Sequence, residues 1–178
     1  MKAVKLLFAA LAMSFAMNAS AEGDHFTFDV KVGGVGGAGG FGFGVGYQKE
    51  LKEFNNWNLA WDVVSFDYAA PFNSPADFDY LSLRTGLRLF TPTFWGGNFR
   101  AYTNLAPGYT CALWKEITEY WGNGMILGYE ENMKAHHGFG LQFGVGLQFK
   151  EKFSLGYQLQ YETAGKGKFH FATFGFTF

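Results

Sequence analysis

The chain of 178 residues has one cysteine, Cys111, and four prolines. A lone cysteine cannot form an internal disulfide, so an exported protein of this size must be stabilised in another way. The chain also has no basic excess, since 14 lysines and arginines stand against 15 acidic residues. This balance argues against nucleic acid as a partner. After the first 21 residues no stretch stays apolar for about eighteen residues, which excludes a transmembrane helix.

The first residues have the pattern of a secretory signal peptide. A basic start with two lysines is followed by an apolar run from Leu6 to Met17 and by a small-x-small motif that ends at Ala21. The apolar run is too short to span a bilayer as a helix. We therefore expect residues 1–21 to be removed and residues 22–178 to form one domain. Without the two lysines, 12 basic residues face 15 acidic ones, and the net charge becomes −3.

Aromatic residues and glycine are abundant instead. Aromatics make up 20% of the chain and glycines number 25, yet the mean hydropathy is only −0.03. This combination fits strands in which every second residue is apolar, and it is typical of membrane-spanning β-barrels.

The last residues show this alternation most clearly. Phe174, Phe176 and Phe178 fall on one face of a strand, while Thr173 and Gly175 fall on the other. The chain ends on Phe178 with no polar tail, and termini of soluble domains usually extend into water. The pattern predicts a strand that separates an apolar phase from a polar one.

Similar alternation along the chain predicts eight strands. A glycine-rich stretch at residues 36–40 precedes a change of apolar parity, which predicts a hairpin, although one long bulged strand is the alternative. We also expect a bulge near Ser65, a kink at Pro107, a polar turn at residues 48–56 and one long loop at residues 115–138. The predicted strands cover residues 25–34, 41–47, 57–68, 80–91, 99–114, 139–149, 153–162 and 169–178.

Charged side chains fall on the parity opposite the apolar row, as do all three arginines. A charge that faces lipid at the bilayer midplane costs about 2–4 kcal/mol, so these side chains should face a lumen. An eight-stranded barrel is only wide enough for side chains to fill it, and we expect no conducting pore. The predicted polar network of the lumen consists of Asp62, Arg84, Arg88, Arg100, Gln142, Gln158, Gln160 and Glu162.

The predicted fold is therefore all-β, an eight-stranded antiparallel up-and-down transmembrane β-barrel. The alternative is a soluble lipocalin-like barrel with its apolar face turned inward around a ligand. That arrangement would place glycine rows on the exterior and would leave the terminal Phe178 without an explanation.

The signal peptide, the eight alternating strands and the ending on Phe178 resemble the small outer-membrane barrels, namely the OmpX, OmpA transmembrane domain and OmpW-like group. The resemblance covers residues 22–178 and implies the outer membrane of a Gram-negative bacterium. It implies contact with outer-membrane lipid and lipopolysaccharide, a monomer, and no cofactor. It also implies that Phe174, Phe176 and Phe178 form the insertion signal that the barrel-insertion machinery reads.

The group also contains lipid A-modifying enzymes, which raises the question of a catalytic site. Hydrolysis needs a nucleophile, a base and an acid that orients the base. Ser74 and Asp77 with His136 or His137 could meet at the outer rim, but no spacing motif supports this set. We expect no enzyme. A small apolar-solute channel with a lateral gap near Pro107 is a further alternative.

Metal sites have equally little support. His136 and His137 with Glu130 and Glu131 lack a repeated ligand spacing, and adjacent histidines on an extended chain point to opposite sides. Asp67 with Asp77 and Asp79 lacks the dense pattern of a calcium loop. We predict no metal site.

The long predicted loop carries aromatic residues among acidic ones, notably Tyr120, Trp121 and Tyr129. They could contact a surface protein partner, or they could pack together or rest among lipopolysaccharide headgroups. The sequence thus favours a non-enzymatic envelope protein whose outer loops carry any interaction.

Overall fold

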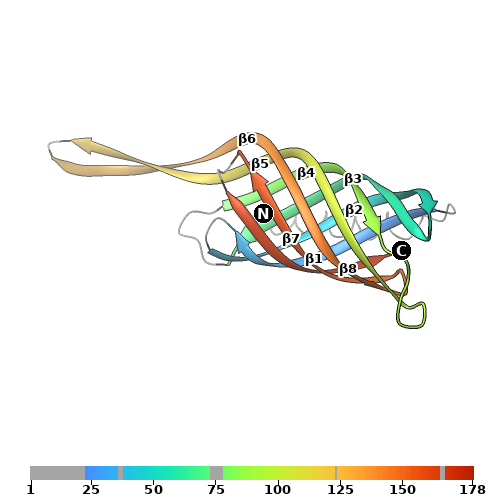
Figure 1. Ribbon diagram of the computed structural model, residues 1–178. Helices are drawn as coiled ribbons and strands as arrows, with labels where there is room; N and C mark the ends of the chain where they lie inside the picture. Colours follow the sequence, from blue (N-terminus) through green and yellow to red (C-terminus); the bar gives the residue numbers. More distant parts are fainter. Residues whose placement is uncertain (1–22, 36–37, 73–77, 123, 165–166) are drawn as a thin grey trace.

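The computed structural model describes residues 23–35, 38–72, 78–122, 124–164 and 167–178. The predicted signal peptide lies outside these residues. The described chain forms eight strands and a closed barrel in sequence order (Figure 1). The strands are β1 (Asp24–Val35), β2 (Ala38–Phe54), β3 (Trp57–Pro71), β4 (Phe78–Phe90), β5 (Phe99–Gly122), β6 (Met125–Phe149), β7 (Phe153–Glu162) and β8 (Lys168–Thr177). The predicted eight-stranded antiparallel fold is confirmed.

The barrel closes where the last strand pairs with the first. β8 runs antiparallel to β1, with Phe28 opposite Phe176 and Val32 opposite Ala172. At the end of this seam the backbone amide of Phe178 donates to the carbonyl of Phe26 at 2.9 Å. Closure pairs the edges of the first and last strands with each other, so the barrel itself exposes no sheet edge along this seam.

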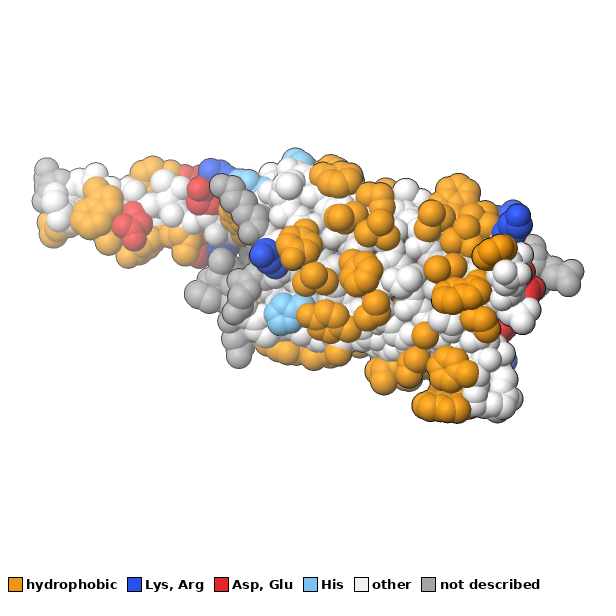
Figure 2. Space-filling model, viewed as in Figure 1, with side chains coloured by type: hydrophobic (Ala, Val, Ile, Leu, Met, Phe, Trp, Pro, Cys, Tyr) orange, Lys and Arg blue, Asp and Glu red, His pale blue; other side chains and the backbone are white. Residues whose placement is uncertain are grey.

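The side chains alternate between a polar interior and an apolar exterior. Buried polar residues such as Lys31, Arg84 and Gln160 point inward, while Leu83, Leu155 and other large apolar residues are exposed. Figure 2 shows hydrophobic side chains spread over the visible face of the barrel wall. A wall of this kind suits lipid and not water, so the inverted lipocalin-like arrangement is wrong.

Two apolar clusters lie inside the barrel, towards its two ends. One contains Val35, Ala69, Tyr80, Phe169 and Phe171. The other, at the opposite end, contains Ala60, Phe90 and Tyr102. The sequence predicts a lumen filled by a polar network, and the two apolar clusters correct that prediction. They cover the charged middle layer from both sides.

Glycines on the inner face make room for this filling. A Cβ atom added at Gly44 would lie 2.6 Å from Asp67 Oδ1 and 2.7 Å from Asp29 Oδ2. Both distances are far below ordinary van der Waals contact, so the carboxylates occupy space that only glycine leaves open. The glycine row of β2 therefore has a packing reason.

Two predicted connections are wrong. Residues 48–56 were expected to be a turn, but β2 continues to Phe54 and the turn consists of Asn55 and Asn56, both at positive φ. Asparagine tolerates this conformation and is common in two-residue hairpins. Residues 115–138 were expected to be a loop, but β5 and β6 continue through them as a two-stranded hairpin. The mixed apolar and acidic composition of that segment hid its strand character.

Irregularities occur at the two predicted positions. The register between β3 and β4 shifts between Asp62 and Ser65, which places a bulge beside the predicted residue. The pairing of β4 with β5 skips from Arg84–Gly108 to Leu87–Leu105, next to Pro107, although the register is kept. Proline has no amide hydrogen to donate, which explains the interruption.

None of the described segments forms a helix long and apolar enough to cross a membrane.

Candidate functional site

A buried ion cluster fills the middle of the lumen around Asp67. Its carboxylate accepts hydrogen bonds from Lys31 Nζ and Arg84 Nη1, and Ser82 Oγ lies 3.4 Å away. Lys31 also lies 3.3 Å from a carboxylate oxygen of Asp29. Side chains of β1, β3 and β4 thus meet in one packed centre, and the glycines of β2 leave the space that this centre occupies.

Arg84 extends this cluster across the barrel to β6 and β7. Its Nη1 donates to Gln142 Oε1 at 2.9 Å, and its Nη2 donates to Tyr80 at 2.9 Å and to Gln160 at 3.3 Å. Gln160 in turn donates to Gln142 at 3.1 Å. One guanidinium therefore ties opposite walls of the barrel together, which stiffens the lumen.

A second ion pair lies nearer the turn between β2 and β3. Arg88 Nη2 contacts Asp62 Oδ2 at 3.2 Å, and Gln48 donates to the other oxygen of that carboxylate at 3.0 Å. Below it, Arg100 donates to Gln148 at 2.7 Å. The guanidinium of Arg100 also lies 3.9 Å from the centre of the Phe90 ring, a cation–π contact.

A cavity of about 20 Å³ lies beside these pairs, lined by Asp29, Lys31, Asp62, Arg88, Gln158 and other residues. A space of this size holds about one water molecule. The buried Arg88 Nε and Gln158 Oε1 atoms have no hydrogen-bond partner among the described residues, and Asp29 Oδ2 makes no contact there beyond its 3.3 Å approach to Lys31 Nζ. The described middle of the lumen is thus filled by side chains.

All eight residues of the predicted polar network lie on the inner face, and seven of them are buried, Arg88 being the half-buried exception. The structure brings Arg84, Gln142 and Gln160 together, and separately Asp62 and Arg88. The sequence reasoning missed Lys31 and Asp67 as the centre of the network. Lys31 shares the inward parity of its strand, but Asp67 takes that parity only after the bulge of β3, and the bulge hides the signal.

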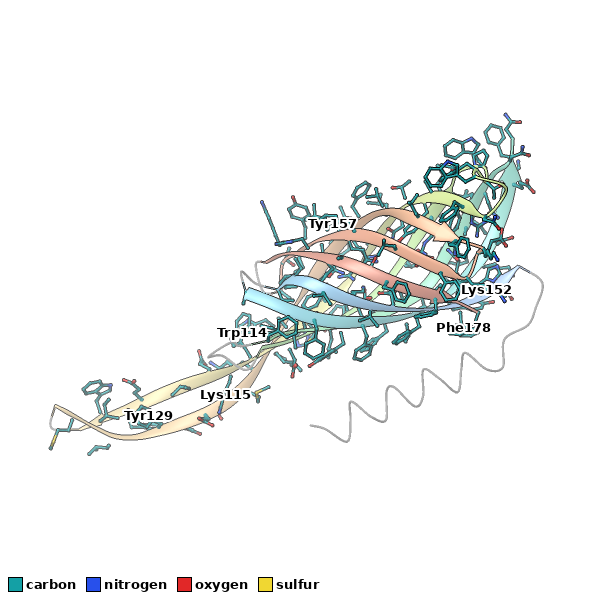
Figure 3. The ribbon with its side chains drawn as sticks, turned by 90° about the horizontal axis from the view of Figure 1, so that it is seen from below. Trp114, Lys115, Tyr129, Lys152, Tyr157 and Phe178 are labelled. Carbon is teal, nitrogen blue, oxygen red and sulfur yellow. The ribbon has the colours of Figure 1, made fainter. Side chains whose placement is uncertain are left out.

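The other distinctive feature is an extension of the β5–β6 hairpin beyond the barrel. β5 last pairs with β4 at Trp114, yet it stays paired with β6 up to Gly122. Eight residues at about 3.3 Å each carry it roughly 26 Å further. Figure 1 shows the extension standing far out from the barrel, and in Figure 3 Trp114 and Lys115 mark its base while Tyr129 lies well along it.

Cross-strand contacts stabilise the extension along its length. At its base Trp114 stacks on His136, with ring centres 3.9 Å apart. Salt bridges join Lys115 to Glu131 and Lys134 to Glu116. Further out the Tyr120 hydroxyl donates to Glu130.

That last hydrogen bond holds the pKa of the Glu130 carboxyl below its usual value and raises the pKa of Tyr120. The hydroxyl stabilises the carboxylate anion, and the same anion disfavours the ionised phenol. The hydrogen bond between Tyr120 and Glu130 therefore helps to hold the two strands of the hairpin together near neutral pH.

Large apolar side chains on the extension are open to solvent. Trp121, Tyr129 and Tyr120 are 63%, 64% and 50% exposed. Trp121 and Tyr129 lie on one face and Tyr120 on the other, as the pairing of Glu119 with Tyr129 requires. The exposed set also includes Ile117, Met125, Ile126, Leu127 and Met133.

The predicted catalytic set is only partly visible. Ser74 and Asp77 lie outside the described residues. His136 stacks on Trp114, whereas His137 contacts the hydroxyl of Tyr109 on the opposite face of the hairpin. The two histidines thus point away from each other.

The residues considered for metal sites lie in different strands, with His136, His137, Glu130 and Glu131 in β6, Asp67 in β3 and Asp79 in β4. The described residues contain no group of three His, Cys, Asp or Glu side chains placed to hold a metal ion. Asp67, considered for calcium, lies in the lumen paired with Lys31 and Arg84, which contradicts that hypothesis. Cys111 is unpaired and half-buried on the outward parity.

The C-terminal phenylalanines lie on the outward face of β8. Phe174 and Phe178 are 46% and 56% exposed. Phe176 contacts both, with ring centres 5.0 Å and 6.5 Å apart. They form an aromatic row on the seam strand that closes the barrel.

Comparison with known proteins found no matching family model and no matching curated protein. Solved structures do match. Neisserial surface protein A has a TM-score of 0.55 at 16% identity, with 89% of this chain and 98% of that chain covered. The outer-membrane enzyme PagL has a TM-score of 0.50 at 13% identity, with 86% and 97% covered. Ail of Yersinia pestis, solved with a heparin analogue, has a TM-score of 0.49 at 18% identity, with 87% and 96% covered.

Neisserial surface protein A and PagL share the fold of small eight-stranded outer-membrane barrels, and this chain has that fold. The identities are too low for more than the fold, and the neighbours include both a surface protein and an enzyme.

Proposed function

We propose that this protein is a non-enzymatic outer-membrane barrel that holds its hairpin extension, residues 115–134, at the cell surface for contact with a protein partner. The observation that carries the proposal is the extension itself, which presents apolar side chains on both faces far from the barrel wall. Two-stranded hairpins are marginally stable in water, so binding a partner would add burial that the hairpin lacks.

The edges of the extension add a second means of contact. On one side of the hairpin, β4 pairs with β5 only as far as Trp114. On the other side, β7 pairs with β6 only from Gly140 onward. Backbone donors and acceptors beyond these points are open to an added strand. Natural edges are commonly protected by lysine or proline, but residues 117–133 contain neither.

Charge defines what kind of partner fits. Residues 117–133 contain Glu119, Glu130 and Glu131 and no lysine or arginine. A partner surface with apolar patches and positive charge would complement this segment. The barrel then serves as an anchor, and its packed lumen supports a role without solute passage.

Site-directed photo-crosslinking on intact cells tests the proposal. A photoreactive phenylalanine derivative at Tyr129 should yield a protein adduct, and Trp121→Ser should reduce its yield several-fold. The matched control is Tyr157, an exposed tyrosine on the barrel wall that should contact lipid (Figure 3). Equal adduct patterns from the two positions would contradict the proposal.

The enzyme alternative has its own measurement. If the protein is not an enzyme, lipid A from cells with and without it should give identical mass spectra. The split orientation of His136 and His137 supports this expectation. A changed acyl pattern would replace the proposed role with lipid A modification.

A further inference from the structure

The two faces of the hairpin extension differ in composition. Where β5 and β6 belong to the barrel, their even-numbered residues, such as Asn104 and Gln142, are buried in the lumen, and their odd-numbered residues point outward. The pairing of β5 with β6 continues this alternation into the extension as far as the pair of Glu119 and Tyr129. The odd-numbered residues 115–121 and 129–133 therefore form a wall-side face, and the even-numbered residues 116–120 and 130–134 form a lumen-side face.

The polar side chains of the lumen-side face contact each other. Glu116 forms a salt bridge with Lys134, and the Tyr120 hydroxyl donates to Glu130. The other described side chains of this face, Thr118 and Asn132, are short and polar. Cross-strand pairs of this kind hold two strands together, and they leave a surface that water solvates well.

The wall-side face instead exposes apolar side chains. Four large side chains of this face are more than half exposed, namely Ile117, Trp121, Tyr129 and Met133. Ile117 and Met133 lie diagonally across the strand pair, so they are neighbours on one surface. Four residues separate Ile117 from Trp121, which at about 3.3 Å each gives an apolar strip roughly 13 Å long.

Membrane hydrocarbon does not reach this strip. The barrel part of β5 runs from Phe99 to Trp114, fifteen residues that at about 3.3 Å each span roughly 50 Å along the strand. A tilt of about 40° reduces this to roughly 38 Å along the barrel axis, whereas the apolar band of such barrels is about 25 Å tall. Ile117 lies three residues beyond Trp114, and Figure 3 shows Tyr129 farther out still. Acyl chains therefore cannot cover the apolar strip.

One carboxylate lies within the strip. Glu119 is exposed between Ile117 and Trp121, and it accepts a hydrogen bond from the indole N–H of Trp121 at 3.2 Å. The other acid of this face, Glu131, is paired with Lys115. Among the described residues Glu119 is in no salt bridge. A cation that approaches the strip therefore finds a carboxylate without a competing lysine or arginine.

We propose that the partner docks on the wall-side face alone, with an apolar surface against the strip and a lysine or arginine on Glu119. The lumen-side face stays in water and keeps the hairpin formed. Buried tryptophan and tyrosine contribute strongly to protein interfaces, and a charge-assisted hydrogen bond fixes orientation. A second copy of this chain would bring the same unpaired glutamate, and like charges disfavour that contact. The inference rests on the proposed function, which it narrows to one face and one kind of partner.

Photo-crosslinking on intact cells at two pairs of adjacent positions tests the assignment. Ile117 and Met133 carry the photoreactive phenylalanine on the wall-side face, and their neighbours Thr118 and Asn132 carry it on the lumen-side face at the same height. We expect protein adducts at Ile117 and Met133, with yields several-fold lower at the two neighbours. Glu119→Lys should lower the adduct yield at Met133 about tenfold because it repels the partner's cation. Thr118→Lys is the control, because it adds a positive charge on the other face.

The outcomes separate the inference from the proposed function. Equal yields on the two faces, higher yields at Thr118 and Asn132, or an unchanged yield in Glu119→Lys would overturn the inference while the hairpin proposal stands. An adduct of twice the mass of this chain, or an adduct with lipopolysaccharide in place of protein, would also overturn it. No protein adduct at these four positions or at Tyr129 would overturn both. A heat-dependent gel shift and the amide protection of the hairpin verify that each variant is folded.

Discussion

Replacing Asp67 with leucine should destabilise the barrel strongly, because this carboxylate joins two buried cations. Lys31 is 1% exposed, Arg84 is 2% exposed and Asp67 is 4% exposed. Removing one member of a buried ion pair typically costs about 3–5 kcal/mol, since the remaining charge stays buried without its partner.

The structure places the expected value at the lower end of that range. Arg84 would keep Tyr80, Gln142 and Gln160 as acceptors, and Lys31 would keep Asp29 at 3.3 Å. We therefore expect a loss of about 3 kcal/mol in the free energy of unfolding. Asp67→Asn keeps one acceptor oxygen but loses the charge, and should cost about 1.5–2 kcal/mol.

Urea unfolding in detergent, followed by tryptophan fluorescence, measures the change. With a denaturant slope of about 2 kcal/mol per molar, a loss of about 3 kcal/mol moves the midpoint down by about 1.5 M. Glu53→Gln is the control, because Glu53 is exposed on β2 next to the β2–β3 turn. This substitution should change the free energy of unfolding by less than about 0.5 kcal/mol. A loss below about 1 kcal/mol for Asp67→Leu would refute the reasoning, because it would mean that water already solvates the cluster.

Three further outcomes follow from the same structure. Gly44→Ala should lower the free energy of unfolding in urea by about 1–3 kcal/mol, because its Cβ would press on two carboxylates. The control Gly128→Ala should be neutral, because no atom lies within 4 Å of the added Cβ. Equal effects of the two substitutions would contradict the packing argument. The lowered pKa of Glu130 means that its contact with Tyr120 stabilises the hairpin above the unfolded pKa and is lost as pH falls through the folded one. The protection factors of the hairpin amides, which correct for the slower intrinsic exchange in acid, should therefore fall as pH drops, and Tyr120→Phe should remove this dependence. Phe178→Ala should lower the heat-modifiable, folded fraction in the outer membrane, and an unchanged gel pattern would argue against an insertion role.

The fold could be predicted because alternation carries so much of the physics. Each strand with an apolar and a polar face can be recognised locally, and the lipid-facing side is fixed by the charges on the other parity. Arg84 and Gln160 were placed in the lumen by parity alone. The contact between Arg84 and Gln160 could not be predicted from the sequence, because the register between strands depends on bulges such as the one before Ser65.

The hairpin extension shows where local reading fails. Residues 115–134 mix acids with aromatics and lack the clean alternation of the barrel strands. The sequence predicts residues 115–138 to be a loop, but β5 and β6 stay paired beyond the barrel, with one register shift between Tyr120 and Trp121. Each added pair closes only a short loop, so it costs little chain entropy. Tyr120 and Tyr129 could be named as exposed aromatics, but not assigned to opposite faces.

The sequence by itself determined the strand number, the polarity of the wall and the separation of charges from lipid, because these depend only on a period of two along the chain. Tertiary structure alone decided that Asp67 is the centre of the lumen, that apolar clusters cover both ends of it, and that a two-stranded extension stands clear of the barrel. Those features arise from contacts between residues that are distant in sequence, and periodicity within a single strand carries no information about them.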